Sequence, residues 1–353
     1  MKLELRRVSV PVEGARDARR TWTERECVLL RCSDADGACG IGEASPLPGY
    51  SRDELDRVEA ALQNLEPTAV ETALQHRSVR AALSSLAQLL PESLPSARMA
   101  LESAGLDLLG KRRGLSAPEL LGAPQGARCS LSALLGRASA PTLGADAEQA
   151  VSRGFRHLKL KVGEPGQLRR ELAAVVELRT RLGPALALRL DANGSWKARE
   201  LEEAWPVLAP LDIELFEEPG DVPEQLAGAL PLALDESLQG LREAEAEGLL
   251  RLRRARYLVL KPTALGGLEH CLRLAERARR AGAGVVVSHC FDGPFAWRAA
   301  AALALALPPG AAHGLAPHAG LAAWRPAPEP IHDGVLESWS EPGLGAPADD
   351  GFS

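Results

Sequence analysis

The sequence lacks an apolar run long enough to span a membrane, and its first residues, Met1 to Arg7, lack the apolar core of a secretion signal. We therefore expect a cytoplasmic protein without a membrane partner. The formal net charge of −6 is small for 353 residues, and so little excess charge does not favour a nucleic-acid partner. The chain is longer than one hydrophobic core usually supports, which predicts two domains.

The cysteines include no Cys-x-x-Cys pair, a spacing typical of zinc and redox sites. Cysteines of a cytosolic protein are usually kept reduced. We therefore expect neither a disulfide nor a zinc site, and interpret all six as reduced core residues: Cys27, Cys32, Cys39, Cys129, Cys271 and Cys290.

Lysine is also scarce, because only six of the 41 basic residues are lysines. Yet three of the six, Lys159, Lys161 and Lys261, fall near the ends of predicted strands. An arginine keeps its proton in a protein, whereas a lysine can be tuned until it releases one. Lysine at these places therefore indicates a need for an ionisable amine.

Five short apolar runs each lead into a polar segment, and Gly, Asn or Pro ends each of them within a few residues. Their charged residues Lys161, Asp191, Glu217, Asp235 and Lys261 are separated by 30, 26, 18 and 26 residues. Each interval fits one strand and one helix. Repeated β-α units with charge at the strand ends predict a parallel barrel with a site at its C-terminal face. The segments are residues 157–163, 188–193, 214–219, 232–237 and 258–262.

The same rhythm extends in both directions and gives eight strands. We expect the first strand at Cys129–Leu134, the seventh at Gly284–Ser288 and the eighth at Ala312–Leu315. Helices are expected between them, among others at residues 145–153, 268–281 and 296–307. The barrel is therefore expected to occupy residues 125–316.

Residues 1–124 have a different pattern, which predicts an α+β module. Strands are expected at residues 2–12, 25–33 and 38–43, with a polar loop at residues 13–24 between the first two. Ser51 and Glu54 are placed as a capping box that opens a helix to about Leu65. Two further helices are expected at residues 79–90 and 97–112. The fold class is therefore α/β, a TIM-like (β/α) barrel with an α+β capping domain formed by the N-terminal region and the C-terminal tail, residues 317–353.

Asp191, Glu217 and Asp235 end three consecutive strands, so their side chains are expected to converge at the barrel mouth. Three carboxylates in one place repel each other unless a cation lies between them. Oxygen ligands with room for water and substrate suit Mg²⁺ better than zinc. The alternative is that each carboxylate is only a helix cap or a salt-bridge partner.

Lys159 and Lys161 share one face of their strand, because side chains alternate along a strand, and Lys261 ends a strand across the barrel. The plainer interpretation is a solvated Lys-x-Lys pair on an edge strand. A free lysine titrates near ~10.4, and a nearby cation should lower the pKa of a lysine in such a site towards neutrality. This arrangement suits removal of a proton next to a carboxylate, with the metal neutralising the charge that develops.

The motifs that carry these residues resemble those of the enolase superfamily, in the muconate-lactonising-enzyme group with Lys-x-Lys on the second barrel strand and Lys-Pro-Thr on the sixth. The resemblance spans the whole chain. Within the group the sequence looks most like the o-succinylbenzoate synthases, mainly through its Ser-Pro-Leu-Pro-Gly loop and its Arg-Leu-Asp-Ala-Asn run. The shared segments are residues 42–51, 157–163, 188–193, 216–219, 235–238 and 259–263.

The resemblance implies a lyase of menaquinone biosynthesis that depends on Mg²⁺, for which Mn²⁺ can substitute. Its substrate would be a small carboxylate, 2-succinyl-6-hydroxy-2,4-cyclohexadiene-1-carboxylate, and its product 2-succinylbenzoate. Lys161 would remove the proton beside the carboxylate and return it to the departing hydroxide, a syn dehydration. Lys261 would act as a cation over the opposite ring face, and Lys159 as the helper of the base. The implied magnesium ligands are Asp191, Glu217 and Asp235.

For substrate binding the resemblance points to Arg189, Asn193, Ser288 and Gly314, and backbone groups around the last two would hold the succinyl tail. The cap loops at residues 13–24 and 45–50 would close over the ligand. The chain departs from its relatives after strand seven, where it reads Ser-His-Cys-Phe-Asp-Gly-Pro instead of Ser-Ser-x-x-Glu-Ser. His289 therefore leaves open a histidine base on that strand.

Two other functions remain open at this point. A racemase or epimerase of N-acylamino acids or dipeptides would use the same two lysines on opposite faces of its substrate. A non-catalytic relative would bind a metal or a carboxylate ligand without turnover. The pair of opposed amines argues against the second alternative, because binding alone does not need it.

Overall fold

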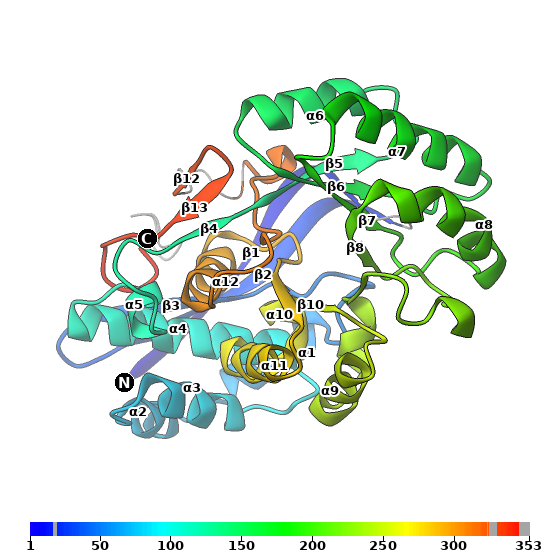
Figure 1. Cartoon of the computed structure of the whole chain (residues 1–353). Helices are drawn as coiled ribbons and strands as arrows, with labels where there is room; N and C mark the ends of the chain where they lie inside the picture. The colour runs from blue at the N-terminus through cyan, green and yellow to red at the C-terminus, as the bar shows by residue number, and fades with distance from the viewer. Residues whose placement is uncertain (17–19, 323, 325–329, 346–353) are drawn as a thin grey trace.

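The computed structural model describes residues 1–16, 20–322, 324 and 330–345. The N-terminal part pairs a three-stranded antiparallel sheet with a group of helices, and a curved parallel sheet surrounded by helices follows it (Figure 1). Among the described residues, no helix combines the length and the apolar character that crossing a membrane requires. All six cysteines are free thiols, as predicted, but only four are buried in the core, because Cys39 and Cys129 are half-buried.

The antiparallel sheet has the strand order β1-β2-β3 and lies against the long helix α4. Gly40 and Gly42 make this close packing possible, because a Cβ atom at either position would collide with the backbone of that helix. The elements of this region are β1 (Lys2–Arg16), β2 (Thr21–Ser33), β3 (Cys39–Ala44), α1 (Leu55–Gln63), α2 (Pro67–Leu74), α3 (Val79–Gln88), α4 (Pro95–Arg113) and α5 (Ala117–Leu120).

The structure corrects two predictions for this region. Of the expected polar loop at residues 13–24, residues 17–19 lie outside the described part of the chain, and residues 13–16 and 21–24 are strand, because after a register shift Ala15 pairs with Trp22. Ser51 does not cap a helix: its hydroxyl accepts a hydrogen bond from the Leu47 amide at 2.9 Å, and Glu54 is the N-cap of α1. Helix α2 was not predicted. Cross-strand pairing and tertiary contacts set the structure of these segments, and a local sequence pattern does not show such contacts.

The parallel sheet runs in chain order from β5 to β11. Its strands are β5 (Ser132–Arg137), β6 (His157–Lys161), β7 (Ala187–Asp191), β8 (Ile213–Glu217), β9 (Leu232–Leu234), β10 (Tyr257–Leu260) and β11 (Gly284–Val287). The α-helices that follow them are α6 (Leu143–Ser152), α7 (Leu168–Leu182), α8 (Ala198–Leu208), α9 (Glu243–Arg251), α10 (Pro262–Leu265), α11 (Leu268–Arg280) and α12 (Pro294–Ala306). Short 3₁₀ turns are η1 (Ala209–Leu211), η2 (Glu224–Leu226), η3 (Glu236–Gly240) and η4 (Ala319–Leu321).

The predicted eighth strand, Ala312–Leu315, is replaced by two isolated bridges. His313 bridges to Leu131 beside β5, and Gly314 bridges to Ser288 beside β11. Two successive residues thus each pair with a different neighbouring segment, and no continuous ladder forms on either side. The bridges nevertheless join the two edges of the sheet, and the fold is the TIM-like barrel with a cap that the sequence predicted.

The described part of the C-terminal tail returns to the N-terminal helices. Strand β13 (Val335–Glu337) pairs with β12 (Ile331–His332) on one side and with β4 (Arg128–Ser130) on the other. Beyond it, the Gly343 carbonyl accepts a hydrogen bond from Ala117 at 2.8 Å, and the Leu344 amide donates to Asp107 at 2.8 Å. The exact domain boundaries at residues 124 and 316 stay predictions.

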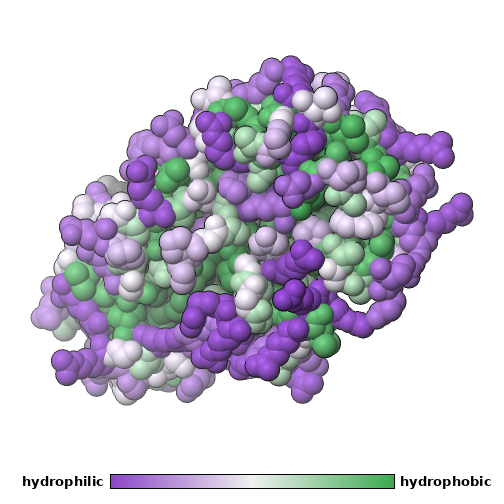
Figure 2. All heavy atoms as spheres, in the orientation of Figure 1, coloured by the Kyte–Doolittle hydropathy of each residue, from purple (hydrophilic) through white to green (hydrophobic). Residues whose placement is uncertain are grey.

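Side chains alternate along β6 as its sequence predicted. Leu158, Leu160 and Val162 are buried in the hydrophobic core, whereas Lys159 and Lys161 point into the barrel interior. On the outside, hydrophilic side chains cover much of the face shown in Figure 2, with hydrophobic patches between them. Charged side chains are rarely buried without a partner, so the positions of Lys159 and Lys161 inside the barrel need a chemical explanation.

Candidate active site

Three buried carboxylates lie at the carboxyl ends of neighbouring strands. Asp191 pairs in register with Glu217 on the adjacent strand, and Asp235 directly follows β9. Each is at most 2% exposed. Burial and the charge of Asp191 raise the pKa of Glu217 to about 8, and burial raises the pKa of Asp235. Such crowding of acids is stable only with positive charge close by.

Two lysines of β6 supply that charge on one side. The Nζ of Lys161 lies 2.6 Å from Oδ2 of Asp191, and the Nζ of Lys159 lies 2.8 Å from the same oxygen and 2.6 Å from Glu217. Burial alone would raise the pKa of Asp191, but the two ammonium groups outweigh it and lower the pKa. Asp191 and Glu217 therefore lie together at the barrel mouth, as predicted, and both lysines of β6 contact them from inside the barrel.

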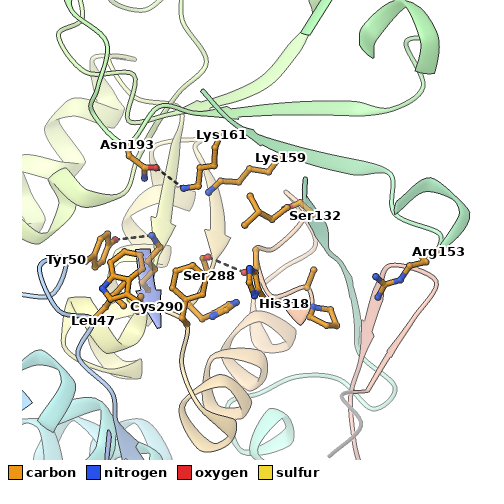
Figure 3. A pocket seen from close by; sticks show the side chains of 18 residues that line it. Leu47, Tyr50, Ser132, Arg153, Lys159, Lys161, Asn193, Ser288, Cys290 and His318 are labelled. Carbon is orange, nitrogen blue, oxygen red and sulfur yellow. Dashed lines mark hydrogen bonds between the residues drawn. The ribbon is translucent and has the colours of Figure 1, made fainter. Parts of the chain in front are cut away.

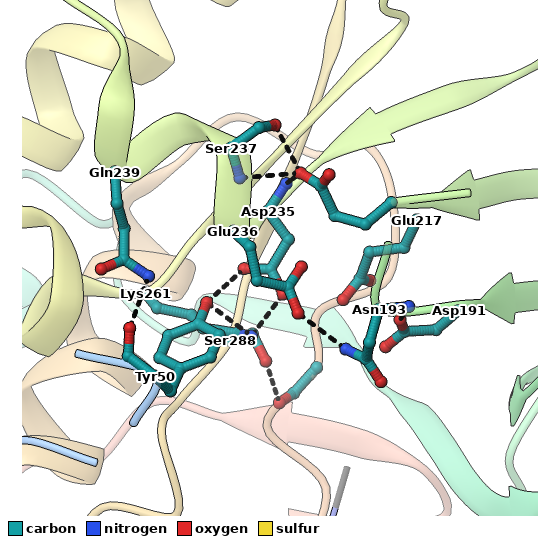
Figure 4. Close-up of polar contacts among 12 residues, drawn as sticks. Tyr50, Asp191, Asn193, Glu217, Asp235, Glu236, Ser237, Gln239, Lys261 and Ser288 are labelled. Atoms are coloured by element: carbon teal, nitrogen blue, oxygen red, sulfur yellow. Dashed lines mark hydrogen bonds and ion pairs between the residues drawn. The ribbon is translucent and has the colours of Figure 1, made fainter. Parts of the chain in front are cut away.

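Lys261 supplies positive charge on the other side, together with a tyrosine of the cap. Its ammonium group contacts Asp235 and lies 3.0 Å from the Tyr50 hydroxyl, which donates to Asp235 at 2.8 Å. The ammonium also lies 4.5 Å from the centroid of the Tyr50 ring (Figure 4). The loop at residues 45–50 was expected to close over the ligand, but the contacts of Tyr50 with Lys261 and Asp235 were not predicted.

The pKa values of two of these lysines differ from the sequence-based expectation of a lowered value. Burial would lower the pKa of Lys159, but Asp191 and Glu217 outweigh it and raise the pKa. Burial would likewise lower the pKa of Lys261, but Asp235 raises it. The expectation assumed that the amines face other cations, whereas here each ammonium lies directly against carboxylates.

The donor set of this cluster fits a hard divalent cation. All its acidic groups offer oxygen, the ligand atom that Mg²⁺ prefers. Glu236, next to Asp235, accepts a hydrogen bond from Asn193 at 2.7 Å through one oxygen, and its other oxygen is buried without a hydrogen-bond partner among the described residues. Within the same residues, no group of three or more acidic, cysteine or histidine side chains is arranged to hold a metal ion. In this arrangement the amines of Lys159 and Lys261 contact the oxygens of Asp191 and Asp235.

A cavity of about 350 Å³ opens beside the lysines and lies between the barrel mouth and the cap (Figure 3). Lys159, Lys161, Lys261 and Asn193 line one part of it, and none of the described residues that line it is an Asp or a Glu. The remaining lining residues are Trp22, Leu47, Tyr50, Ser132, Leu134, Arg153, Ser288, His289, Cys290, Phe291, Gly314, Ala316, Pro317 and His318. Apolar and neutral polar side chains therefore share the lining with lysines and an arginine, and this excess of positive charge suits an anionic ligand.

Arg189 does not line this cavity, which corrects its prediction as a substrate-binding residue. Its side chain is 1% exposed and lies one layer below the mouth, two residues before Asp191. It donates to both oxygens of Glu214, at 2.6 and 2.9 Å, and to the Ala312 carbonyl at 2.6 Å. Arg189 therefore joins strand β7 to β8 and to the segment that closes the barrel.

The predicted binding residues Asn193, Ser288 and Gly314 do line the cavity. Asn193 accepts a hydrogen bond from Lys161 at 2.9 Å. The backbone amides of Ser288 and Gly314, however, already donate to carbonyls of the barrel strands at 2.9 and 2.8 Å. These two amides are therefore not available to hold a substrate tail. His289 lines the cavity next to Phe291.

Buried Arg25 ties the cap loop to the loop after β11, a role that sequence reasoning missed. It donates to the carbonyls of Ser45 and Pro46 at 2.6 and 2.9 Å, and to those of Cys290 and Phe291 at 3.3 and 3.2 Å. Both loops contribute lining residues, so one guanidinium fixes two walls of the cavity.

Two family models together match most of the chain. Residues 2–122 match the mandelate racemase / muconate lactonizing enzyme N-terminal domain, and residues 142–351 match the enolase C-terminal domain-like family. The chain therefore belongs to the enolase superfamily, whose members are enzymes and typically use Mg²⁺.

Individual relatives carry different names within that superfamily. The L-Ala-D/L-Glu epimerase of Bacillus subtilis is 30% identical over 83% of this chain and 81% of its own length. The o-succinylbenzoate synthase of Desulfotalea psychrophila is 28% identical over 79% and 81%. The solved muconate lactonizing enzyme of Pseudomonas fluorescens, complexed with muconolactone, superposes with a TM-score of 0.83 over 99% of this chain and 96% of that one, at 26% identity. These comparisons leave the particular reaction open.

Proposed function

We propose that this enzyme is an o-succinylbenzoate synthase, which dehydrates 2-succinyl-6-hydroxy-2,4-cyclohexadiene-1-carboxylate to 2-succinylbenzoate. The observation that carries the proposal is the order of charged groups around the barrel mouth. Lys161 on β6 and Lys261 after β10 lie on either side of strands β7, β8 and β9, which end in the acidic cluster. A substrate carboxylate held at that cluster places its α-carbon between two amines.

Lys161 is the proposed base. In its neutral form its Nζ takes the proton from the carbon beside the carboxylate, and then gives that proton to the departing hydroxide on the same face. Its bonds to Asp191 and Asn193, at 2.6 and 2.9 Å, hold the amine at the cavity wall. One amine that serves both steps accounts for a syn elimination.

Lys261 is the proposed electrostatic partner. Its ammonium is held between Asp235 and Tyr50, and it faces the cavity from the other side. There it attracts the negative charge that spreads over the ring and the carboxylate once the proton has left. Asp191, Glu217 and Asp235 would hold the Mg²⁺ ion, which supplies further neutralisation of that charge when bound.

The charge of the cavity supports a dianionic substrate over a dipeptide. A dipeptide brings a free ammonium group, and burying it requires a carboxylate partner. The described residues that line the cavity include three lysines and one arginine but no Asp or Glu. An N-acylamino acid has no free ammonium, so a racemase of N-acylamino acids, which would use the same lysines, is the second candidate.

The two candidates differ in what they do to their substrates. With Mg²⁺, the purified enzyme is offered the cyclohexadiene substrate while ring aromatisation is followed by ultraviolet absorbance. In parallel it is offered an N-succinylamino acid in D₂O, and mass spectrometry follows deuterium at the α-carbon. We expect aromatisation with the higher kcat/KM. Deuterium exchange without aromatisation would reject the synthase and favour the racemase.

A further inference from the structure

A second chamber of about 270 Å³ adjoins the cavity described above, and the mechanism makes no use of it. The two share one wall, formed by Leu134, Arg153, Lys161 and residues 316–318. The chamber therefore begins beside the proposed base. In Figure 3, Arg153 lies at the end of the cavity opposite Tyr50.

The chamber lies where the barrel wall is interrupted. The last bridge beside the first barrel strand joins Leu131 to His313, and the pairing of β5 with β6 shifts register between Leu134 and Arg137. Leu134, at the start of this irregularity, is 41% exposed. Its side chain offers an apolar surface between the lysine end and the arginine end of the cavity.

Arg153 is the charged group at the far end of this apolar surface. It is exposed, forms no ion pair with a described carboxylate, and lies with its guanidinium 5.6 Å from the centroid of the Phe155 ring. The other charges of the chamber are engaged: Arg137 pairs with Glu164 at 3.2 Å, and Asp146 accepts a hydrogen bond from Thr142 at 2.8 Å. Stacking on an aromatic ring leaves the guanidinium edge available to an anion.

We propose that this chamber is the subsite for the substrate's distal tail, a short methylene chain that ends in a carboxylate, and that Arg153 is the residue that selects it. The proposal rests on the proposed function, because it assigns the succinyl tail to a place in the protein. It also explains how a dianion is held when the amides of Ser288 and Gly314 are already used by the barrel. Leu134 contacts the methylene groups and Arg153 pairs with the carboxylate.

The test uses two ligands and measures binding, so that it does not depend on turnover. One ligand is 2-succinylbenzoate, and the other is 2-butanoylbenzoate, in which a methyl group replaces the distal carboxylate. Calorimetry gives Kd for each with the wild type, Arg153→Gln and Arg153→Lys. Arg156→Gln is the matched control, because Arg156 is also exposed, lies three residues away and lines neither chamber.

The wild type should prefer the succinyl ligand, and Arg153→Gln should weaken that ligand alone by about tenfold or more, the size expected for a lost charge-assisted hydrogen bond. Arg153→Lys should recover part of the loss, and Arg156→Gln should bind like the wild type. In turnover, Arg153→Gln should raise KM and leave kcat near its original value.

An equal loss for both ligands, no loss for either, or a wild type without preference would overturn the subsite. An enzyme that keeps the Arg153-dependent preference but never aromatises the cyclohexadiene substrate would reject the proposed function and retain the subsite.

Discussion

The hydroxyl of Tyr50 lies 3.0 Å from the Nζ of Lys261 and 2.8 Å from Oδ1 of Asp235. The first residue belongs to a loop of the cap, and the other two belong to the barrel. One phenol therefore joins the cap to the proposed electrostatic amine. The Lys261 ammonium is therefore held in place only when the cap loop packs correctly on the barrel.

Tyr50→Phe should lower kcat about tenfold while the protein stays folded. The phenyl ring still covers the Lys261 ammonium, but the lost hydroxyl leaves that amine free to move against Asp235. Steady-state kinetics measures the effect, and circular dichroism reports the fold. A variant with unchanged kcat would show that the hydroxyl does not position Lys261.

Chelation should silence the enzyme, and added Mg²⁺ or Mn²⁺ should restore it. Three carboxylates, with the Glu236 oxygen that has no hydrogen-bond partner in the described part of the chain, would supply oxygen donors to a divalent cation. Activity is followed during titration with EDTA and then with each metal, and Na⁺ serves as the control. Full activity in excess chelator would remove the metal from the account.

Glu102 should make stability fall as the pH rises. This buried side chain accepts hydrogen bonds from the amides of Leu268 and Glu269, at 2.6 and 2.9 Å, and burial raises its pKa from 4.5 to about 8. The folded state then binds the proton more tightly than the unfolded state. Stability from this group is therefore complete below about pH 4.5 and is lost as the pH rises towards about 8.

Glu102→Gln should flatten this pH dependence, because the amide keeps a neutral acceptor at the start of α11. Urea unfolding between pH 5 and pH 9, roughly the window that the pKa shift defines, measures the slope. Glu92→Gln is the control, because the Glu92 side chain is 92% exposed. If the Glu102 variant kept the slope of the wild type, the assigned titration would be wrong.

Arg189→Gln should destabilise the barrel by about 3–5 kcal/mol, because it removes the guanidinium hydrogen bonds of partly buried Glu214 and leaves that carboxylate with His157. The loss should appear as a lower urea midpoint, and the folded fraction should keep the KM of the wild type. A large rise in KM without loss of stability would contradict this structural role and show that Arg189 binds substrate.

Local patterns predicted the lysines and the acidic cluster because alternation and turn residues suffice to locate a strand end. Depth within the barrel was not predictable in the same way: Arg189 shares the face of Asp191 but lies one layer deeper. The cap loop at residues 45–50 was predicted to cover the ligand, but the contacts of Tyr50 and the position of Arg153 were not, because they depend on how that loop meets the barrel and on an irregularity in β5. Tertiary contacts set the positions of both residues, and the hydrophobic periodicity of the sequence does not predict such contacts.

The most direct test of the account is the reaction of Lys161→Ala with the cyclohexadiene substrate, measured together with its affinity for Mg²⁺. We predict that aromatisation falls by at least about 10³-fold, since the general base is lost, while Mg²⁺ binds nearly as in the wild type. Aromatisation at a rate close to that of the wild type would contradict the assignment of Lys161 as the base, and with it the proposed mechanism.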